Sequence, residues 1–333
     1  MSGKVVLVTG HQLYDEARAL LDANGIDIVY SEERIDSAEL AAIAAQHRVD
    51  GIIVRQGVID DTVMAASDRL VVLSRHGVGV DLIDLEAATR RGLPVLKATG
   101  ANASSAAEHT IGLIYALIKD FFALDRSVRQ GHWGKHGHIG REIAGLRLGL
   151  IGCGAIGSIV ARTATRLGMQ VQVFDPATAV PDGIGRTSSL DELLTTSEVV
   201  SLHCPLTAQN MHMMNADTLW RMPRGAFLIN TARGGLVEED ALIAGLQSGH
   251  LGGAALDCYA QEPPPQHHPL WQMSNVILTP HIAGAGRSGM KAMAMTSVKN
   301  VLDTFAGHPL RREVLANPAV VGGPLVSPAI KFE

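Results

Sequence analysis

The sequence predicts an α/β protein built from two doubly wound parallel sheets, and three observations lead to this prediction. Short apolar runs alternate with helix-like patterns along most of the chain, as in parallel strands joined by crossover helices. Hydrophobic residues make up 47% of the 333 residues and aromatic residues only 4%, which suits strands buried on both faces. A glycine-rich turn near the middle of the chain opens a second series of such elements, and the length suits about two domains.

The first series of alternating elements occupies roughly the first 100 residues. Apolar runs predict buried strands at Val5–Val8, Ile26–Val29, Ile52–Val54, Leu70–Leu73 and Val95–Leu96. Helical patterns, several of them beginning at Asp or Ser, lie near Tyr14–Ala23, Ser37–His47, Asp61–Ser67 and Leu82–Arg90. This series forms a complete α/β unit without a phosphate-binding glycine turn, so we expect its role to be other than cofactor binding.

The second series begins with one long predicted helix, from about Asn102 to Val128. Its predicted strands are Leu148–Ile151, Val171–Phe174, Val199–His203, Ala226–Asn230, Gly253–Leu256 and Val276–Leu278. The helices between them lie near Ile156–Leu167, Leu190–Thr195, Ala216–Arg221 and Glu239–Gln247. Because ligands of such sheets bind beyond the carboxyl ends of the strands, we expect the functional residues at strand ends, in a cleft between the two domains.

A last helix, from Ser288 to about Phe305, follows after the second sheet is complete, and the segment after Gly307 is Pro-rich. We expect this helix to cross back and pack on the first domain. The N-terminal domain is therefore predicted to be discontinuous, with residues 1–100 plus 287–333, and the second domain to cover residues 101–286.

The glycine-rich turn follows the predicted strand Leu148–Ile151 and contains Gly152, Gly154 and Gly157 in the pattern G-x-G-x-x-G. The first glycine allows a tight turn, the second lets the backbone approach a pyrophosphate, and the third lets helix and strand pack closely. The next strand ends at Asp175, roughly the ~20 residues downstream at which an acid meets a ribose hydroxyl. These features predict a Rossmann-like dinucleotide site, and the acid favours NAD over NADP because it repels a 2′-phosphate.

Three later strand ends carry polar residues: Arg233, Glu262 and His281. A guanidinium holds a carboxylate and polarises a carbonyl through its planar fork, and a histidine exchanges a hydroxyl proton near neutral pH. A carboxylate behind the histidine orients the ring and favours its charged form. Each residue alone indicates little, but together with the dinucleotide turn they predict hydride transfer between NAD and a 2-hydroxy acid/2-keto acid pair.

From about Val49 to Pro318 the sequence resembles the D-2-hydroxyacid dehydrogenase family, within it the phosphoglycerate dehydrogenase and hydroxypyruvate/glyoxylate reductase branch. Besides the strand-end segments, the resemblance rests on Gly51-Ile-Ile-Val-Arg-Gln, Gly77-Val-Gly-Val-Asp-Leu-Ile-Asp, Asn102-Ala-Ser-Ser-Ala-Ala-Glu-His-Thr and His203-Cys-Pro-Leu-Thr. It implies that Arg233, Glu262 and His281 are catalytic, that the first domain is a flavodoxin-like substrate domain, and that the protein is a homodimer paired through the NAD-binding domain and the long helix.

The resemblance also implies a set of binding residues. Cofactor contacts carried over by motif fall on Val78, Gly152, Gly154, Ala155, Ile156, Gly157, Asp175, Cys204, Pro205, Thr231, Ala232, Arg233, Asp257, His281 and Gly284. Substrate contacts fall on Arg55, Gln56, His76, Gly77 and Arg233, partly through backbone N–H groups. The chain departs from the family pattern at Gln56, His76, Leu82 and Gly286-Arg287, and His76 and Arg287 are candidates for shaping the substrate pocket.

Composition and motifs argue against other classes of protein. The net charge of −5 is unfavourable for nucleic acid, no stretch approaches a membrane span, and the opening apolar run is too short for a signal peptide. Three cysteines without metal-ligand spacing favour a reducing, cytoplasmic location. The histidines of Gly131–His138 lack accompanying carboxylates, so we expect no metal. The chain's length also leads us to expect no C-terminal regulatory domain.

Three alternatives use the same fold. A formate dehydrogenase has Gln in place of the Glu, so Glu262 argues against it. Phosphite oxidation keeps all three strand-end residues and stays open. An NAD-sensing corepressor also reuses the fold and the triad, but the sequence offers no recognisable peptide-docking surface.

Overall fold

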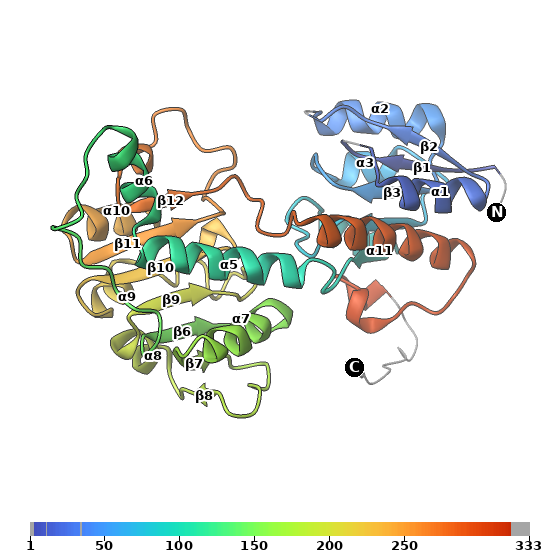
Figure 1. The fold of residues 1–333 in the computed structure, drawn as a ribbon. Coiled ribbons are helices and arrows are strands. Elements are labelled where there is room, and N and C mark those ends of the chain that lie inside the picture. The colour runs from blue at the N-terminus through green and yellow to red at the C-terminus, as the bar shows by residue number, and fades with distance from the viewer. Residues whose placement is uncertain (1–2, 11, 34, 321–333) are drawn as a thin grey trace. The chain divides into compact units, whose positions relative to one another are not determined.

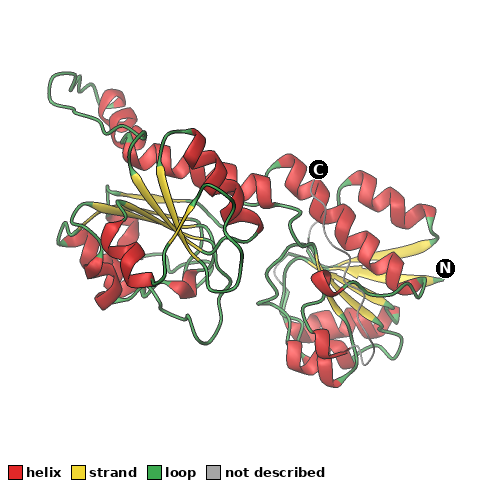
Figure 2. Ribbon diagram, turned by 90° about the horizontal axis from the view of Figure 1, so that it is seen from below, coloured by secondary structure: helices red, strands yellow, loops and turns green. Residues whose placement is uncertain are grey.

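The computed structural model describes residues 3–10, 12–33 and 35–320. The chain divides into two compact units, which we call unit 1 (residues 1–102 and 287–333) and unit 2 (residues 103–286). Each unit is a parallel sheet with helices on both faces (Figures 1 and 2). The fold is therefore α/β with two parallel sheets, as the sequence predicts, and the boundary between the units falls two residues after the expected one.

Unit 1 contains a five-stranded sheet in the order β2-β1-β3-β4-β5, the order of flavodoxin-like sheets. Its strands are β1 (Lys4–Val8), β2 (Ile26–Tyr30), β3 (Gly51–Val54), β4 (Val72–Arg75) and β5 (Val95–Lys97). Its helices are α1 (Asp15–Ala23), α2 (Ser37–His47), α3 (Asp61–Ala65), α4 (Leu85–Arg90) and α11 (Arg287–Phe305), followed by short 3₁₀ turns at Arg312–Val314 and Pro318–Val320.

Alternate residues of these strands enter different cores, as the pleat of a strand dictates. Ile52 and Leu73 pack against α2, α3 and α4, whereas the neighbouring Ile53 and Val72 pack against α1 and α11. Helix α11 therefore completes one face of a sheet whose strands come from the first hundred residues. The Ser74 hydroxyl, which donates to the carbonyl oxygen of Ser297 at 3.0 Å, ties the helix to that sheet.

Unit 2 contains a seven-stranded sheet in the order β12-β11-β10-β9-β6-β7-β8, a Rossmann order with one further strand at the β12 edge. Its strands are β6 (Arg147–Ile151), β7 (Gln170–Phe174), β8 (Gly185–Arg186), β9 (Val199–Leu202), β10 (Ala226–Asn230), β11 (Leu251–Leu256) and β12 (Val276–Leu278). Its helices are α5 (Ala103–Ile118), α6 (Phe121–Arg129), α7 (Ala155–Arg166), α8 (Leu190–Thr196), α9 (Ala216–Arg221) and α10 (Glu239–Gln247), with 3₁₀ turns at Gly234–Leu236 and Pro269–Gln272.

The two faces of the unit 2 sheet bury separate cores. Helices α5 and α7 cover one face, and α8, α9 and α10 cover the other (Figure 1). This double cover explains why the strands are apolar on both faces, and it leaves the carboxyl ends of the strands free for polar residues.

The predicted long helix from Asn102 to Val128 is wrong in one respect, because the segment forms two helices. Helix α5 ends at Ile118, and Asp120 adopts a left-handed backbone conformation with φ 52° before α6 begins. Asp is among the few residue types that tolerate this conformation, because its short side chain can form local hydrogen bonds. The sequence pattern does not predict strand β8, and β4 begins two residues later than expected.

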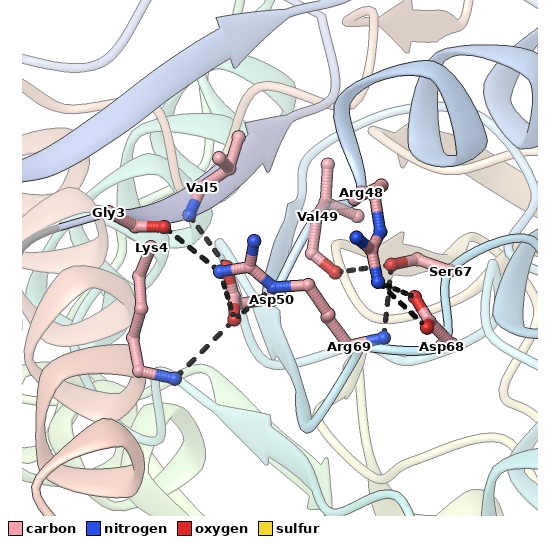
Figure 3. Close-up of polar contacts among 9 residues, drawn as sticks. All are labelled: Gly3, Lys4, Val5, Arg48, Val49, Asp50, Ser67, Asp68 and Arg69. Atoms are coloured by element: carbon pink, nitrogen blue, oxygen red, sulfur yellow. Dashed lines mark hydrogen bonds and ion pairs between the residues drawn. The ribbon is translucent and has the colours of Figure 1, made fainter.

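A buried carboxylate ties β1, β3 and the segment before β4 together in unit 1 (Figure 3). Asp50, which is 3% exposed, accepts hydrogen bonds from the Val5 N–H at 2.8 Å and from the Arg69 guanidinium at 2.8 to 3.2 Å. Lys4 adds an ion pair at 3.4 Å. The neighbouring pair of Arg48 and Asp68, also drawn in Figure 3, is by contrast largely exposed.

Candidate active site

The carboxyl ends of the unit 2 strands bring most of the predicted residues to one edge of the sheet. All neighbouring strands pair in parallel, so the segments after β6, β7, β9, β10, β11 and β12 emerge at the same edge. Those segments carry the glycine turn, Asp175, Cys204, Arg233, Asp257 and His281.

The three glycines of the turn have different surroundings. Gly152 has φ 98°, and a Cβ on it would lie 2.6 Å from the Cys204 nitrogen, so the turn needs glycine here. A Cβ on Gly157 would collide with the carbonyl oxygen of Gly152. A Cβ on Gly154 would meet nothing within 4 Å, although this residue is the N-cap of α7 and no side chain caps the helix there. The helix N-terminus is thus open at Gly154, where a pyrophosphate needs close approach.

Asp175 stabilises the same turn through hydrogen bonds to backbone N–H groups. It is 8% exposed, and its carboxylate accepts the N–H groups of Cys153 at 2.7 Å and of Ala177 and Thr178 at 2.8 Å. Burial on its own raises the pKa of this carboxyl, but the three N–H donors lower it below its ordinary value. Asp175 therefore stays ionised. A ribose hydroxyl that donates to this carboxylate would share its oxygens with the three N–H groups that they already accept.

A hollow beside Asp175 lies at the end of β7. Its volume is about 400 Å³, and it is lined by Phe174, Asp175, Pro176, Arg186, Thr187 and Ser188. The Arg186 guanidinium donates to the carbonyl oxygen of Asp175 at 3.0 Å. The hollow therefore presents one carboxylate and one guanidinium.

Glu262 and His281 form a hydrogen-bonded pair, with Oε2 of the carboxylate 2.7 Å from Nδ1 of the ring. The Tyr259 N–H donates to the other carboxylate oxygen at 3.1 Å. Burial raises the pKa of the Glu262 carboxyl, but the hydrogen bonds from His281 and Tyr259 and the nearby charge of Arg233 lower it below its ordinary value. Glu262 is thus ionised, the hydrogen of the pair belongs to Nδ1, and Nε2 is left to exchange a proton.

His281 lies in a loop that is stabilised by hydrogen bonds to the Asp257 carboxylate. The His281 backbone has φ 53°, in the left-handed region. Asp257 is fully buried, and its carboxylate accepts the Thr279 hydroxyl at 2.6 Å and the N–H groups of Ile282 and Ala283 at 2.9 and 2.8 Å. Since bonds on both sides of His281 end on one carboxylate, Asp257 stabilises the strained turn that presents the ring.

Arg233 follows β10 in a loop that Asn230 clamps. The Asn230 amide donates to the Arg233 carbonyl oxygen at 2.8 Å and accepts the Ala232 N–H at 3.0 Å. The Arg233 guanidinium donates to the Ala232 carbonyl oxygen at 2.7 Å. The charge of Arg233 acts on Glu262, so the three predicted catalytic residues belong to one electrostatic group.

The remaining predicted contacts of unit 2 lie around this edge. Thr231 shares a 2.9 Å hydrogen bond with Thr110 of α5, and burial raises the pKa of the Cys204 thiol to about 11. Ala155 and Ile156 open α7, Pro205 follows Cys204, and Gly284 follows the His281 loop.

Residues 111–283 match the family model described as "D-isomer specific 2-hydroxyacid dehydrogenase, NAD binding domain". This match covers more than half of the chain. The chain belongs to this family.

Curated relatives and solved structures agree with the family assignment. A D-3-phosphoglycerate dehydrogenase of Archaeoglobus fulgidus is 33% identical over 92% of this chain, which spans 59% of that relative's length. A glyoxylate reductase of Thermofilum pendens is 37% identical over 75% of this chain and 76% of the relative. The crystal structure of the TT0316 protein from Thermus thermophilus is 35% identical and matches 91% of this chain and 97% of its own, with a TM-score of 0.84.

Apart from Arg233, the predicted substrate residues of this dehydrogenase family member belong to unit 1, at the ends of β3 and β4. The N–H groups of Arg55 and Gln56 donate to the Thr9 hydroxyl at 3.0 and 3.1 Å, and the Gly77 N–H donates to the Arg75 carbonyl oxygen. These backbone donors are thus engaged within unit 1. The side chains of Arg55 and Gln56 remain as candidate substrate contacts, together with His76, which is 8% exposed, and Val78 as a candidate cofactor contact.

Sequence reasoning missed the residues that hold the catalytic candidates in place. Tyr259 donates its N–H to Glu262 and its hydroxyl to the Thr279 carbonyl oxygen at 3.0 Å, and burial and nearby carboxylates raise its pKa to about 12, so the hydroxyl keeps its proton. Asn230 and His109, which lies 3.2 Å from the Thr279 hydroxyl, were likewise missed. A signal was present, since each of the three lies within a motif of the family resemblance or within a strand-end segment.

No helix in the described ranges is long and apolar enough to span a membrane.

Proposed function

We propose that this protein is an NAD-dependent oxidoreductase that interconverts a D-2-hydroxy acid and its 2-keto acid by hydride transfer. The observation that carries the proposal is the 2.7 Å pair of Glu262 and His281, which lies on the same sheet edge as an open glycine turn and Arg233. Family membership supports the same chemistry.

The residues present suit a dinucleotide. The space at Gly154, the uncapped N-terminus of α7 and the hollow beside Asp175 would receive the pyrophosphate and the adenosine ribose. When bound, the nicotinamide ring supplies or accepts the hydride.

The acid/base role falls to His281. Its Nδ1–H is held by an ionised carboxylate, which fixes the ring and its tautomer and stabilises the ring when it is charged. Nε2 then donates the proton that completes the substrate hydroxyl, or removes it in the reverse direction. Arg233 binds the substrate carboxylate and polarises the carbonyl, because the paired N–H donors of a planar guanidinium match the spacing of these substrate oxygens.

The experiment that tests the proposal is loss of NADH absorbance with glyoxylate, hydroxypyruvate, pyruvate, phosphohydroxypyruvate and sulfopyruvate. We expect turnover with at least one of them, and a His281→Asn variant to lose it by about 10³-fold while NADH binding persists. Asn is the matched replacement because it tolerates the left-handed backbone of this position. A His281→Asn variant with most of the wild-type rate, or silence across the panel despite NADH binding, contradicts the proposal.

The choice of NAD rests on Asp175. Its ionised carboxylate disfavours a 2′-phosphate, although the Arg186 guanidinium in the same hollow would attract one. We expect NADH to be preferred over NADPH, and Asp175→Ser to reduce that preference by about 10-fold or more because Arg186 then acts unopposed. Equal use of the two cofactors by the wild-type protein contradicts this assignment.

The exposed apolar residues of α6 and the following loop support the homodimer. Helix α6 has no buried residue, and Figure 2 shows it and its loop extending from the body of unit 2. The exposed side chains are Phe121, Phe122, Val128, Trp133 and Ile139, between 51% and 94% exposed. Light scattering should give twice the chain mass of 35.2 kDa, and Phe122→Glu should shift the protein toward a monomer.

A further inference from the structure

Cys258, the second residue after β11, adds a third potential ligand to the Glu262–His281 pair. One ligand atom from each of the three side chains lies within 4.8 Å of the other two. Cys258 is 2% exposed, and its thiol contacts the Ala232 carbonyl oxygen at 3.4 Å. The side chains of Glu262 and His281 are 37% and 45% exposed, so a small cation from solvent reaches the group from their side.

The three ligand types match the preference of zinc. Thiolate sulfur, imidazole nitrogen and carboxylate oxygen are its usual ligands in proteins, and three protein ligands with an open fourth position form a stable site. Among the residues that the structure describes, no other three His, Cys, Asp or Glu ligand atoms gather in this way. The exposed histidines between residues 132 and 138 therefore do not form a second group of ligand atoms of this kind.

We propose that Cys258, Glu262 and His281 form an inhibitory site for a thiophilic divalent cation such as Zn²⁺. The inhibition rests on the proposed function, because two of the three ligands are its acid/base pair; the binding itself does not. The cation is a regulator from solution and takes no part in hydride transfer.

Binding exchanges protons for the metal without any redox step. The cation takes the place of the hydrogen between His281 Nδ1 and Glu262, and the ring stays neutral because Nε2 gains a proton as Nδ1 loses one. The cation also displaces the thiol proton of Cys258, which leaves to solvent, so binding releases one proton in all. The 2.7 Å distance between Nδ1 and the carboxylate oxygen opens to roughly 3.4 Å, as bonds of about 2.1 Å to a tetrahedral zinc require. The metal-bound ring no longer exchanges a proton with a substrate, so turnover stops.

The first test is direct binding of Co²⁺, a spectroscopic substitute for Zn²⁺, to the full-length protein. A thiolate bound to Co²⁺ produces a charge-transfer band in the near ultraviolet, which binding through histidine and carboxylate alone does not give. We expect the band in the wild-type protein and in Cys153→Ser, which alters another buried cysteine as the matched control. Cys258→Ser and Cys258→Ala should both lack it, and His281→Asn should change it.

The second test is inhibition by Zn²⁺, with each variant compared with its own metal-free rate. Zn²⁺ should inhibit the wild-type protein, whereas Mg²⁺ at the same concentration should not. For the same degree of inhibition, Cys258→Ser should need a Zn²⁺ concentration ~10-fold higher or more. Absence of the cobalt band in the wild-type protein, or a band unchanged in both Cys258 variants, overturns the inference. The band requires no turnover, so failure of the metal site and failure of the proposed activity are told apart.

Discussion

His76 is a buried side chain whose surroundings oppose a positive charge. Burial, followed by the charges of Arg55 and Arg75, lowers its pKa from 6.5 to about 4. Its backbone N–H meanwhile donates to the Val54 carbonyl oxygen, which fixes the residue at the end of β4. A neutral imidazole therefore stands beside Gly77, where the sequence departs from the family pattern.

The shifted pKa of His76 predicts a loss of stability in acid. Below pH 6.5 the unfolded chain binds a proton at this residue, whereas the folded protein does not until about pH 4. The free energy of unfolding of unit 1 should fall over this interval, by on the order of 3 kcal/mol, and should be unaffected by this residue above it.

A His76→Gln variant should lack this part of the acid dependence. Hydrogen exchange of β3 and β4 peptides in urea, measured from about pH 7 to about pH 4, reports the difference between the two proteins. The explanation fails if the variant and the wild-type protein lose protection in parallel.

At the scale of single residues, sequence reasoning identified the side chains of the site but not their contacts. Arg233, Glu262 and His281 could be singled out because each follows an apolar run. The 2.7 Å contact between Glu262 and His281 could not, because it depends on a left-handed backbone at His281 that a distant carboxylate stabilises. The Thr9 hydroxyl that engages Arg55 and Gln56 lies 46 and 47 residues away in sequence, so spacing gives no indication of it.

At the scale of elements, two glycines of the turn between β6 and α7 are expected to serve different purposes. Gly157 is needed for packing, and Gly154 is expected to be needed for cofactor binding. Gly157 has no room for a Cβ, whereas Gly154 has open space on that side and an ordinary backbone conformation, with φ −68°. Two substitutions that add the same single methyl group should therefore fail in different ways.

We predict that Gly157→Ala destabilises unit 2, by about 1–3 kcal/mol or more, because the methyl group meets the Gly152 carbonyl oxygen. Gly154→Ala should keep the stability of the wild-type protein and weaken NADH binding by ~10-fold or more, because the methyl group occupies the approach to the helix N-terminus. Thermal unfolding and NADH fluorescence titration measure the two effects. If Gly154→Ala still binds NADH tightly, the pyrophosphate does not bind at this position.

The Asp50 cluster and its neighbour in Figure 3 form a second matched pair of tests. Asp50→Ala removes a buried acceptor of the Val5 N–H and leaves Arg69 without its bidentate partner, so we expect a loss of about 3 kcal/mol in stability. Asp68→Ala breaks only the exposed pair with Arg48 and should cost less than about 1 kcal/mol. Urea unfolding of both variants provides the comparison, and similar losses would mean that the burial of Asp50 contributes little.

Most elements could be predicted because buried strands and amphipathic helices leave a periodic pattern. Helices such as α2 and α10 and strands such as β10 and β12 begin and end where the pattern does. Strand β8 contains only Gly185 and Arg186, both exposed, and so leaves no apolar run to detect. The break at Asp120 lies within a continuous helical pattern and is visible only as a backbone conformation.

At the scale of the whole molecule, the two units differ in how the chain builds them. Unit 2 is continuous, and the buried residues of its two cores all lie between Ala107 and Leu270. Unit 1 needs both ends of the chain, because one of its two cores joins Val6, Ile53 and Val72 to Val298 and Val301 of α11. The return of the last helix could be expected from the sequence, because that helix follows a completed sheet.

This difference predicts how fragments behave. A fragment of residues 103–286 should fold cooperatively and bind NADH, whereas residues 1–102 alone should lack cooperative unfolding because they lack α11, which together with α1 covers one face of their sheet. Adding residues 287–320 through a short linker should restore it. Circular dichroism melts test all three, and a cooperative melt of residues 1–102 alone would show that α11 is dispensable.

The place of α11 in the chain also sets an order of events during synthesis. A ribosome completes every strand of unit 2 before it makes the helix that closes the sheet of unit 1, so the part of the chain made first is the last to acquire its full core. Throughout that interval the apolar face formed by Val6, Ile53 and Val72 lacks α11 on the nascent chain and is covered only in part, by α1. Chaperones that recognise exposed hydrophobic segments should therefore associate with the N-terminal strands until residues near 305 have left the exit tunnel.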